Sequence, residues 1–359
     1  MTIQRPLVSF YVIAYNQEEY VRQAVEGAFS QTYQPLEIIL SDDCSADRTF
    51  SIMEQMAGAY VGPHEIVLRR NSSNLGVGAH INQILGVCRG QIIIASAGDD
   101  WSIPERVERL LDWWSTHVPI AALVYSNLTE VDREGCLLHR CDFRKVHLST
   151  SEEESAVVSW TLREHIDGRS LPVHGASFAY KREVFDSCGP LCPGVIFEDN
   201  VFNVRAEVMG GVALCPEALV YHRTHDEQVT NMYSNGDIGK NLDRRRQIKW
   251  NEGLTLRQNR KDIGTLSSQG LIEPRLYERA QSWLERRIQT ADAEYAIEFG
   301  SWPGRVLSLF KYRHMEGIVK PNRRLILRSL TPDWVYTFAL RIAGVVCRKS
   351  LRKRLNNCV

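Results

Sequence analysis

The sequence has no long apolar run, no paired-cysteine motif and no internal repeat. No stretch approaches the roughly 20 apolar residues that a membrane-spanning helix needs. Residues 1–6 are polar and a β-rich segment follows at once, so we expect no secretory signal peptide. The nine cysteines form no CxxC pair, which argues against a zinc ribbon or a disulfide framework, and we interpret them as reduced thiols of a cytoplasmic protein.

The net charge is zero, but the charges are unevenly distributed. Residues 305–359 contain 13 lysines and arginines against two acids, whereas the first 304 residues contain 30 basic and 41 acidic residues. Because residues 334–348 place apolar side chains on one helical face, we expect this basic tail to lie on an anionic membrane surface or to pack on the body of the protein. No nucleic-acid motif accompanies the charge, so we expect no nucleic-acid partner.

Apolar β-rich segments alternate with helical segments over the first 130 residues. The expected strands are residues 7–15, 36–40, 64–69, 92–95 and 121–126. Apolar residues recur with helical period in the segments between them, as in helices that cover a sheet. This alternation predicts an α/β fold with a mostly parallel sheet flanked by helices.

Beyond residue 127 the pattern is looser. A strand is expected at 171–180, a helix at 197–209 and two short strands at 212–214 and 218–222. Long, charged helical patterns then cover 238–260 and 274–299. The three expected parts of the chain are an α/β domain at 1–234, a helical extension at 235–330 and the basic amphipathic tail at 331–359.

Carboxylates follow three of the expected strands. Glu18 lies after the first strand, Asp43 after the second, and Asp99 and Asp100 after the strand that reads IIIA. In a parallel sheet these strand ends meet at one edge, where ligands of α/β proteins bind. Adjacent acids repel each other unless a cation is near, and carboxylates suit Mg²⁺ or Mn²⁺ that carries a phosphate. The alternative for the last pair is a helix cap at Asp100 or Ser102.

Several segments together carry a resemblance to a known family. VSFYVIAYNQEEYVRQAVEGAFSQTY, EIILSDDCSADRT, NLGVGAHINQIL and GQIIIASAGDDWSIPERV, in this order and spacing, resemble the family 2 glycosyltransferases of the GT-A fold. The similarity covers about residues 7–127 and resumes at HGASFAYKREVF, FEDNVFNVRAEV and YHRTH, but not from residue 235 onward. The resemblance implies a Rossmann-like GT-A sheet and a nucleotide-sugar donor.

The resemblance also implies a role for individual residues. Asp43 would bind the pyrimidine base of a UDP- or dTDP-sugar, and Asp100 would ligate Mn²⁺ or Mg²⁺ together with His225. The family often has a further acid at the position of Ala97, so this chain has one carboxylate fewer there. The residues assigned to donor binding are Ala14, Tyr15, Asn16, Glu18, Asp43 and Asp99.

Asp199 is the residue that the resemblance assigns as the catalytic base, with Glu198 beside it on the acceptor side. Both acids also fit a simpler role at the start of a helix, where they complement the helix dipole. Gly175 and Ala176 would lie beside the acceptor, or would be small residues of a packed strand. Trp101 would stack on a sugar, or would belong to the core.

These features predict an inverting glycosyltransferase that moves a sugar from a nucleotide-diphosphate sugar to a hydroxyl of a saccharide or lipid-linked acceptor. We expect it to act in bacterial surface-polysaccharide synthesis, in the cytoplasm and peripherally on the inner face of the membrane. A sugar-nucleotide pyrophosphorylase would show a Gly-rich, Arg-containing loop after the first strand, which AYNQEEY lacks. A non-catalytic sugar-nucleotide or glycan-binding protein would not need Asp199.

Overall fold

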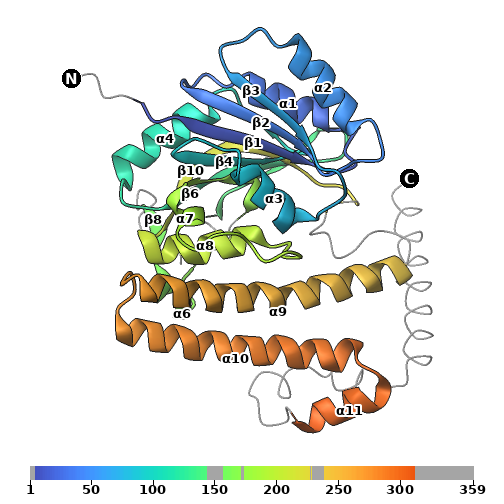
Figure 1. Cartoon of the computed structure of the whole chain (residues 1–359), viewed down its shortest axis with the longest axis vertical. Coiled ribbons are helices and arrows are strands. Elements are labelled where there is room, and N and C mark those ends of the chain that lie inside the picture. The colour runs from blue at the N-terminus through green and yellow to red at the C-terminus, as the bar shows by residue number, and fades with distance from the viewer. Residues whose placement is uncertain (1–4, 144–156, 171–173, 227, 229–237, 312–359) are drawn as a thin grey trace, which may run out of the picture. The chain divides into compact units, whose positions relative to one another are not determined.

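The computed structural model of the chain describes residues 5–143, 157–170, 174–226, 228 and 238–311 (Figure 1). The chain divides into two compact units, of which the first comprises Met1–His225 with Arg257–Trp283 and the second Asp226–Leu256 with Leu284–Val359. The expected three-part division at residues 234 and 330 stays a prediction. The expected basic amphipathic tail at 331–359 lies outside the described residues.

One mixed sheet organises the first unit. Its main path runs β3 (Glu65–Arg70), β2 (Leu36–Asp42), β1 (Val8–Ala14), β4 (Ile92–Ala97), β9 (Phe178–Lys181), β6 (Leu123–Val131), β10 (Val212–Arg223) and β5 (Trp101–Ser102). Off this path, β7 (Leu137–Cys141) pairs with β6, and β8 (Val158–Trp160) pairs with β10.

The strand pairings make six strands, β1, β2, β3, β4, β6 and β10, run in one direction. The four shorter strands run the other way, so the mostly parallel sheet expected from the sequence is confirmed. β1 lies between β2 and β4, and the registers Ala14–Asp42 and Ile13–Ala97 bring the carboxyl ends of these three strands level. The strand order therefore reverses at β1, with β2 and β3 on one side of it and β4 on the other. Open α/β sheets bind ligands at such a reversal.

Helices cover both faces of this sheet (Figure 1). Because side chains alternate along a strand, Val8, Phe10 and Val12 face one side, where they join the core formed with α1, α2 and α4. The opposite side of β2 carries Ser41, which bonds to His80 of α3. The helices of the sheet domain are α1 (Val21–Phe29), α2 (Thr49–Ala59), α3 (Val77–Leu85), α4 (Arg106–His117), α6 (Leu162–Ile166), α7 (Glu183–Asp186) and α8 (Glu198–Met209).

Three expectations about local structure are wrong. The helix after Asp100 begins only at Arg106, so neither Asp100 nor Ser102 caps it. Gly175–Ser177 forms a turn of 3₁₀ helix, and the strand starts after it at Phe178. The two short late strands are one strand, β10, which continues across irregular pairing with β6 between Cys215 and Val220. Local patterns miss the continuity of β10 because pairing with β6, not side-chain periodicity, keeps this strand extended.

Three further helices follow the sheet domain: α9 (Ile238–Ser268), α10 (Pro274–Phe299) and α11 (Trp302–Lys311). In the first unit, the ends of α9 and α10 that meet at their connecting turn are anchored by a buried ion pair, in which Arg205 Nε of α8 donates to Asp262 Oδ2 of α9 over 2.7 Å. In the second unit, Lys249 bonds to Glu294 over 2.9 Å and ties the two helices together. No described helix is long and apolar enough to cross a membrane.

Replacing Asp262 by Ala should destabilise the protein by about 3–5 kcal/mol, because it leaves the buried guanidinium of Arg205 without its charge partner. Urea unfolding followed by circular dichroism measures the loss. Glu278→Ala, which removes an exposed acid of α10, is the matched control and should change little. The double variant Arg205→Met, Asp262→Leu should recover much of the stability, and equal stability of Asp262→Ala and the control would contradict the prediction.

Candidate active site

The loop after β1 is bonded to the loop after β2 in both directions. Asn16 N–H donates to Ser45 Oγ over 2.8 Å, and Asn16 Oδ1 accepts the N–H of Ala46 over 2.9 Å. Glu18 Oε2 accepts both the N–H of Arg48 over 2.9 Å and its Nε over 3.0 Å. Asn16 and Glu18 therefore help to build one continuous wall at the sheet edge, and their polar groups hold that wall together.

Close backbone packing joins this wall to the end of β4. A side chain on Gly98 would place its Cβ 2.8 Å from the Cβ of Ala14 and 2.5 Å from Gln17 Oε1, so only glycine fits. The carbonyl of Ala14, a buried residue, accepts the N–H of Asp43 over 2.9 Å. Tyr15 follows with 44% of its surface exposed. Ala14 and Tyr15, which were assigned to donor binding, thus lie at the end of β1 beside the loops after β2 and β4.

Asp43 is buried, and its carboxylate is held by three hydrogen bonds from its own chain. Oδ1 accepts Asn71 Nδ2 over 2.7 Å and the N–H of Leu75 over 2.9 Å, and Oδ2 accepts the N–H of Gly76 over 2.9 Å. His80 Nδ1 lies 4.0 Å from Oδ2. Burial lowers the pKa of His80 to about 4, so the imidazole beside Asp43 is neutral at pH 7.

Asp99 and Asp100 have different partners. Asp99 Oδ2 lies 3.0 Å from His225 Nε2, although 126 positions separate the two residues. Asp100 is buried, and its Oδ1 accepts the N–H of Arg223 over 2.8 Å. Burial, and then the charge of Asp99, raise the pKa of Asp100 well above its usual range. The structure therefore brings the two predicted metal ligands, Asp100 and His225, and the predicted donor-binding residue Asp99 to the end of β10.

Arg223 links four parts of this edge. Its Nε donates to the carbonyl of Asp99 over 3.1 Å, and its Nη2 donates to Gln23 Oε1 of α1 over 2.6 Å. Its Nη1 donates to the carbonyls of Asp132, over 3.5 Å, and Arg133, in the turn between β6 and β7. The sequence shows only that Arg223 follows a strand, so this connecting role was not predictable from it.

Aromatic rings surround the same guanidinium. It lies 4.8 Å from the ring centroid of Tyr20 and 5.0 Å from that of Trp101, distances typical of cation–π contacts. The Trp101 ring also stacks on Tyr221, with centroids 4.7 Å apart and planes at 10°. These two contacts of Trp101 are with β10, and its predicted contact with an acceptor sugar stays a prediction.

Glu198 and Asp199 form a second acidic pair in the first turn of α8. Gly175 lies against them, because a Cβ there would be 3.1 Å from Glu198 Oε1 and 3.6 Å from the Cβ of Asp199. The 3₁₀ turn that contains Gly175 and Ala176 contacts β4, β6 and β10. The expected acceptor-side residues, Trp101 excepted, are therefore neighbours, and they adjoin the strands that carry the donor-side residues.

The two acids of this pair titrate far from their usual range. Burial and the neighbouring charge of Asp199 raise the pKa of Glu198 to about 8. Burial raises the pKa of Asp199 to about 6, against the opposing effect of backbone N–H groups of Asn200 and Gly175. Near pH 7 the pair therefore holds one proton, mainly on Glu198, and Asp199 is mainly ionised.

Comparison with protein-family models identifies the chain. Residues 9–189, just over half of it, match the model described as glycosyl transferase family 2. The chain belongs to this family. Recognition of the family from the sequence motifs is thereby confirmed.

Curated relatives of this glycosyltransferase include bacterial proteins. An uncharacterized protein of Mycobacterium tuberculosis is 27% identical over 223 residues, which cover 61% of this chain and 59% of the relative. Chondroitin synthase of Escherichia coli is 36% identical over 138 residues, which cover 38% of this chain and 19% of that protein. The chain thus spans only part of the length of these relatives.

Solved structures share the fold. S. aureus TarS 1–349 in complex with UDP-GlcNAc superposes with a TM-score of 0.51 at 14% identity, over 85% of this chain and 89% of that one. Mannosyltransferase PcManGT of Pyrobaculum calidifontis in complex with GDP-Man and Mn²⁺ gives a TM-score of 0.50 at 16% identity, over 96% and 87%. The expected GT-A architecture, with helices after the sheet domain, is confirmed.

Replacing Arg223 by Lys should destabilise the glycosyltransferase by about 1–3 kcal/mol, because one ammonium group cannot reach acceptors in three directions. Chemical unfolding measures this loss. The exposed Arg22, whose Nη2 is 3.4 Å from Gln55 Oε1, provides the control Arg22→Lys, for which we expect no measurable change. A similar stability of both variants would show that Arg223 does not hold this edge together.

Proposed function

We propose that this protein is an inverting glycosyltransferase that moves a sugar from a nucleotide-diphosphate sugar to a hydroxyl of a saccharide or lipid-linked acceptor. The observation that carries the proposal is the Glu198–Asp199 pair beside Gly175. An acid–base reaction at neutral pH needs a carboxylate that is ionised yet basic enough to accept a proton. A pKa of about 6 gives Asp199 this property.

Asp199 takes the proton of the attacking acceptor hydroxyl in this proposal. The N–H of Asn200 donates to Asp199 Oδ1 over 2.7 Å and fixes the carboxylate at the start of α8. Glu198 keeps its proton at pH 7 and can therefore donate a hydrogen bond to the acceptor. The missing side chain of Gly175 lets its backbone lie close against both acids, because a Cβ there would be 3.1 Å from Glu198 Oε1.

The donor nucleotide lies along the wall formed by Ala14, Tyr15, Asn16 and Glu18. We assign the base to Asp43. Three of the roughly four lone-pair positions of its carboxylate are used by the chain, so one on Oδ2 remains for the N3–H of a uracil or thymine ring. This chemistry supports a UDP- or dTDP-sugar as the donor.

The potential metal ligands at the end of β10 fit a hard divalent cation. Asp99 Oδ2 and His225 Nε2 offer an oxygen and an imidazole nitrogen 3.0 Å apart, and the carboxylate is the ligand type that suits Mn²⁺ or Mg²⁺. No third His, Cys or carboxylate ligand joins them within 4.8 Å in the part of the chain that the structure describes. Diphosphate oxygens of the donor would fill the remaining positions, as such ions commonly require.

We assign direct contact with this ion to Asp99 and His225, and we place Asp100 behind them. Asp100 was the ligand expected from the sequence, but its Oδ1 accepts a backbone N–H of Arg223 and the residue is buried. A bound divalent ion supplies charge neutralisation for the departing diphosphate. Arg223 keeps the loop of Asp99 in place, because its Nε donates to the carbonyl of Asp99.

The biological setting that we propose is bacterial cell-surface polysaccharide synthesis. Its support is family membership together with the similarity to chondroitin synthase of Escherichia coli. A cytoplasmic location, peripheral on the inner membrane face, belongs to the same proposal. The basic tail that would bind anionic lipid lies outside the described residues, and its role stays a prediction.

Asp199→Asn should lower kcat by about 10²–10⁴-fold, because the amide cannot accept the hydroxyl proton. In the wild type, kcat/KM should rise as the pH passes about 6, where Asp199 loses its proton. Sugar transfer is measured as the release of nucleoside diphosphate, with a panel of UDP- and dTDP-sugars and saccharide acceptors.

Asp112→Asn, at an exposed position of α4, is the matched control for the Asp199→Asn variant and should keep full activity. Binding of UDP by the Asp199→Asn variant, measured calorimetrically, should equal that of the wild type. Undiminished transfer by this variant would exclude Asp199 as the base. Donor binding by the wild type without any transfer would favour a non-catalytic sugar-nucleotide-binding protein.

Asp99→Asn should weaken the effect of Mn²⁺ on UDP binding about tenfold, because a ligand oxygen anion is replaced by a neutral amide. The measurement is the thermal shift by UDP with and without Mn²⁺, together with Mn²⁺ binding followed by electron paramagnetic resonance. His225→Ala should behave similarly, whereas Asp112→Asn should match the wild type. An unchanged Mn²⁺ effect in both site variants would refute the proposed ligands.

A further inference from the structure

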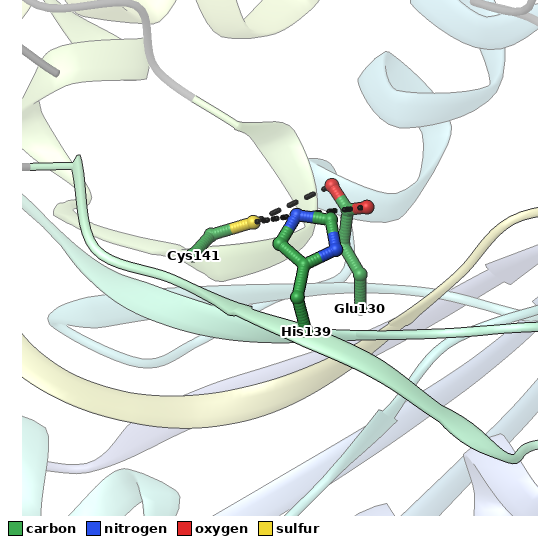
Figure 2. Close-up of side chains that lie close together, drawn as sticks. All are labelled: Glu130, His139 and Cys141. Atoms are coloured by element: carbon green, nitrogen blue, oxygen red, sulfur yellow. Dashed lines mark hydrogen bonds and ion pairs between the residues drawn. The ribbon is translucent and has the colours of Figure 1, made fainter.

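A second group of potential metal ligands lies on the hairpin formed by β6 and β7. Figure 2 shows the side chains of Glu130, His139 and Cys141 pointing toward one another from these two strands. None of them belongs to the donor, acceptor or metal residues assigned above. Within the described residues, this is the one group of three His, Cys or carboxylate side chains whose ligand atoms all lie within 4.8 Å of one another.

The hairpin register explains why these three side chains meet. Glu130 of β6 is the direct partner of His139 of β7, and directly opposed residues project from the same face of a sheet. Cys141 is two residues beyond His139, so it points to that face as well. Antiparallel pairing therefore brings Glu130 together with the short motif His-x-Cys in one cluster.

The spacing within the cluster is short enough for the three side chains to share one ion, with each oxygen of the Glu130 carboxylate facing a different partner. Cys141 Sγ lies 3.4 Å from Glu130 Oε1 and 3.5 Å from His139 Nε2, and His139 Nε2 lies 3.4 Å from Glu130 Oε2. The last distance exceeds that of an ordinary N–H···O hydrogen bond. Tetrahedral Zn²⁺, with bonds of about 2.0–2.3 Å, separates its S, N and O ligands by about 3.3–3.6 Å.

We propose that Glu130, His139 and Cys141 bind a Zn²⁺ ion with one coordination position left open. Thiolate and imidazole ligands favour zinc over the Mn²⁺ or Mg²⁺ of the candidate active site. Binding forms the Zn–S bond and breaks the S–H bond of Cys141, whose proton passes to solvent. The His139 side chain is 60% exposed, so the ion can enter from solvent and the fourth position is open to water.

The location gives this ion a role in fixing the hairpin. The Cα of Glu130 pairs with that of His222 on β10, next to Arg223. Arg223 binds the carbonyls of Asp132 and Arg133 in the turn of the same hairpin. Zinc bound by Glu130, His139 and Cys141 would fasten β7 to β6 next to this turn. The site would therefore hold in place a ribbon that borders the candidate active site.

Cobalt(II) provides the test, because a Co²⁺–thiolate bond gives a charge-transfer absorption that carboxylate and imidazole ligands do not give. We expect the metal-stripped full-length protein to bind one Co²⁺ with this absorption and to lose it when Zn²⁺ is added. Cys141→Ser should remove the absorption and weaken Co²⁺ binding at this site at least about tenfold. Glu130→Gln should weaken binding but keep the absorption.

Two controls isolate this site. Cys136→Ser changes an exposed thiol in the same hairpin and should leave the absorption intact. Asp99→Asn changes the ion site of the proposed reaction and should also leave it intact, so a failure of that reaction would not affect this test. Circular dichroism verifies that each variant is folded. No thiolate absorption in the wild type, or equal absorption in folded Cys141→Ser, would overturn the proposal.

Discussion

The parallel pairing of β1 with β2 and β4 is the constraint on which the candidate active site depends. Because the carboxyl ends of these strands are level, the loops that carry Asp43 and Asp99 leave the sheet at the same edge, on either side of the loop after β1. Gly98 allows the loop after β4 to pack closely on the end of β1 and the loop that follows it. β10 runs in the same direction, and this brings Arg223 and His225 to the same edge.

Negative charge at this edge is balanced in different ways. Backbone and side-chain N–H groups hold Asp43, and the backbone of Arg223 holds Asp100. The described contacts of Glu198 and Asp199 include no cation, and their pKa values are raised to about 8 and 6. A pair that shares one proton near neutrality is suited to acid–base chemistry, whereas a carboxylate held by N–H donors is suited to positioning.

The hairpin of β6 and β7 adjoins both of the proposed metal sites. Its turn is bonded to Arg223, whose Nε donates to the carbonyl of Asp99 and whose backbone N–H donates to Asp100 Oδ1. Its strands carry the Glu130 cluster. The two sites differ in ligand chemistry. At the proposed site on the sheet edge, the carboxylate and the diphosphate oxygens would suit a hard cation, whereas the thiol on the hairpin would favour a softer ion.

The sequence by itself determined the alternation of strands and helices, the family motifs and the positions of the acids after their strands, because these are encoded in local periodicity and short motifs. The tertiary structure decided the partners. Pairing of Asp99 with His225 depends on the direction of β10, the Glu130 cluster depends on hairpin register, and the stacking of Trp101 depends on the two-residue strand β5. Contacts between distant segments follow from strand order and register, which no local pattern specifies.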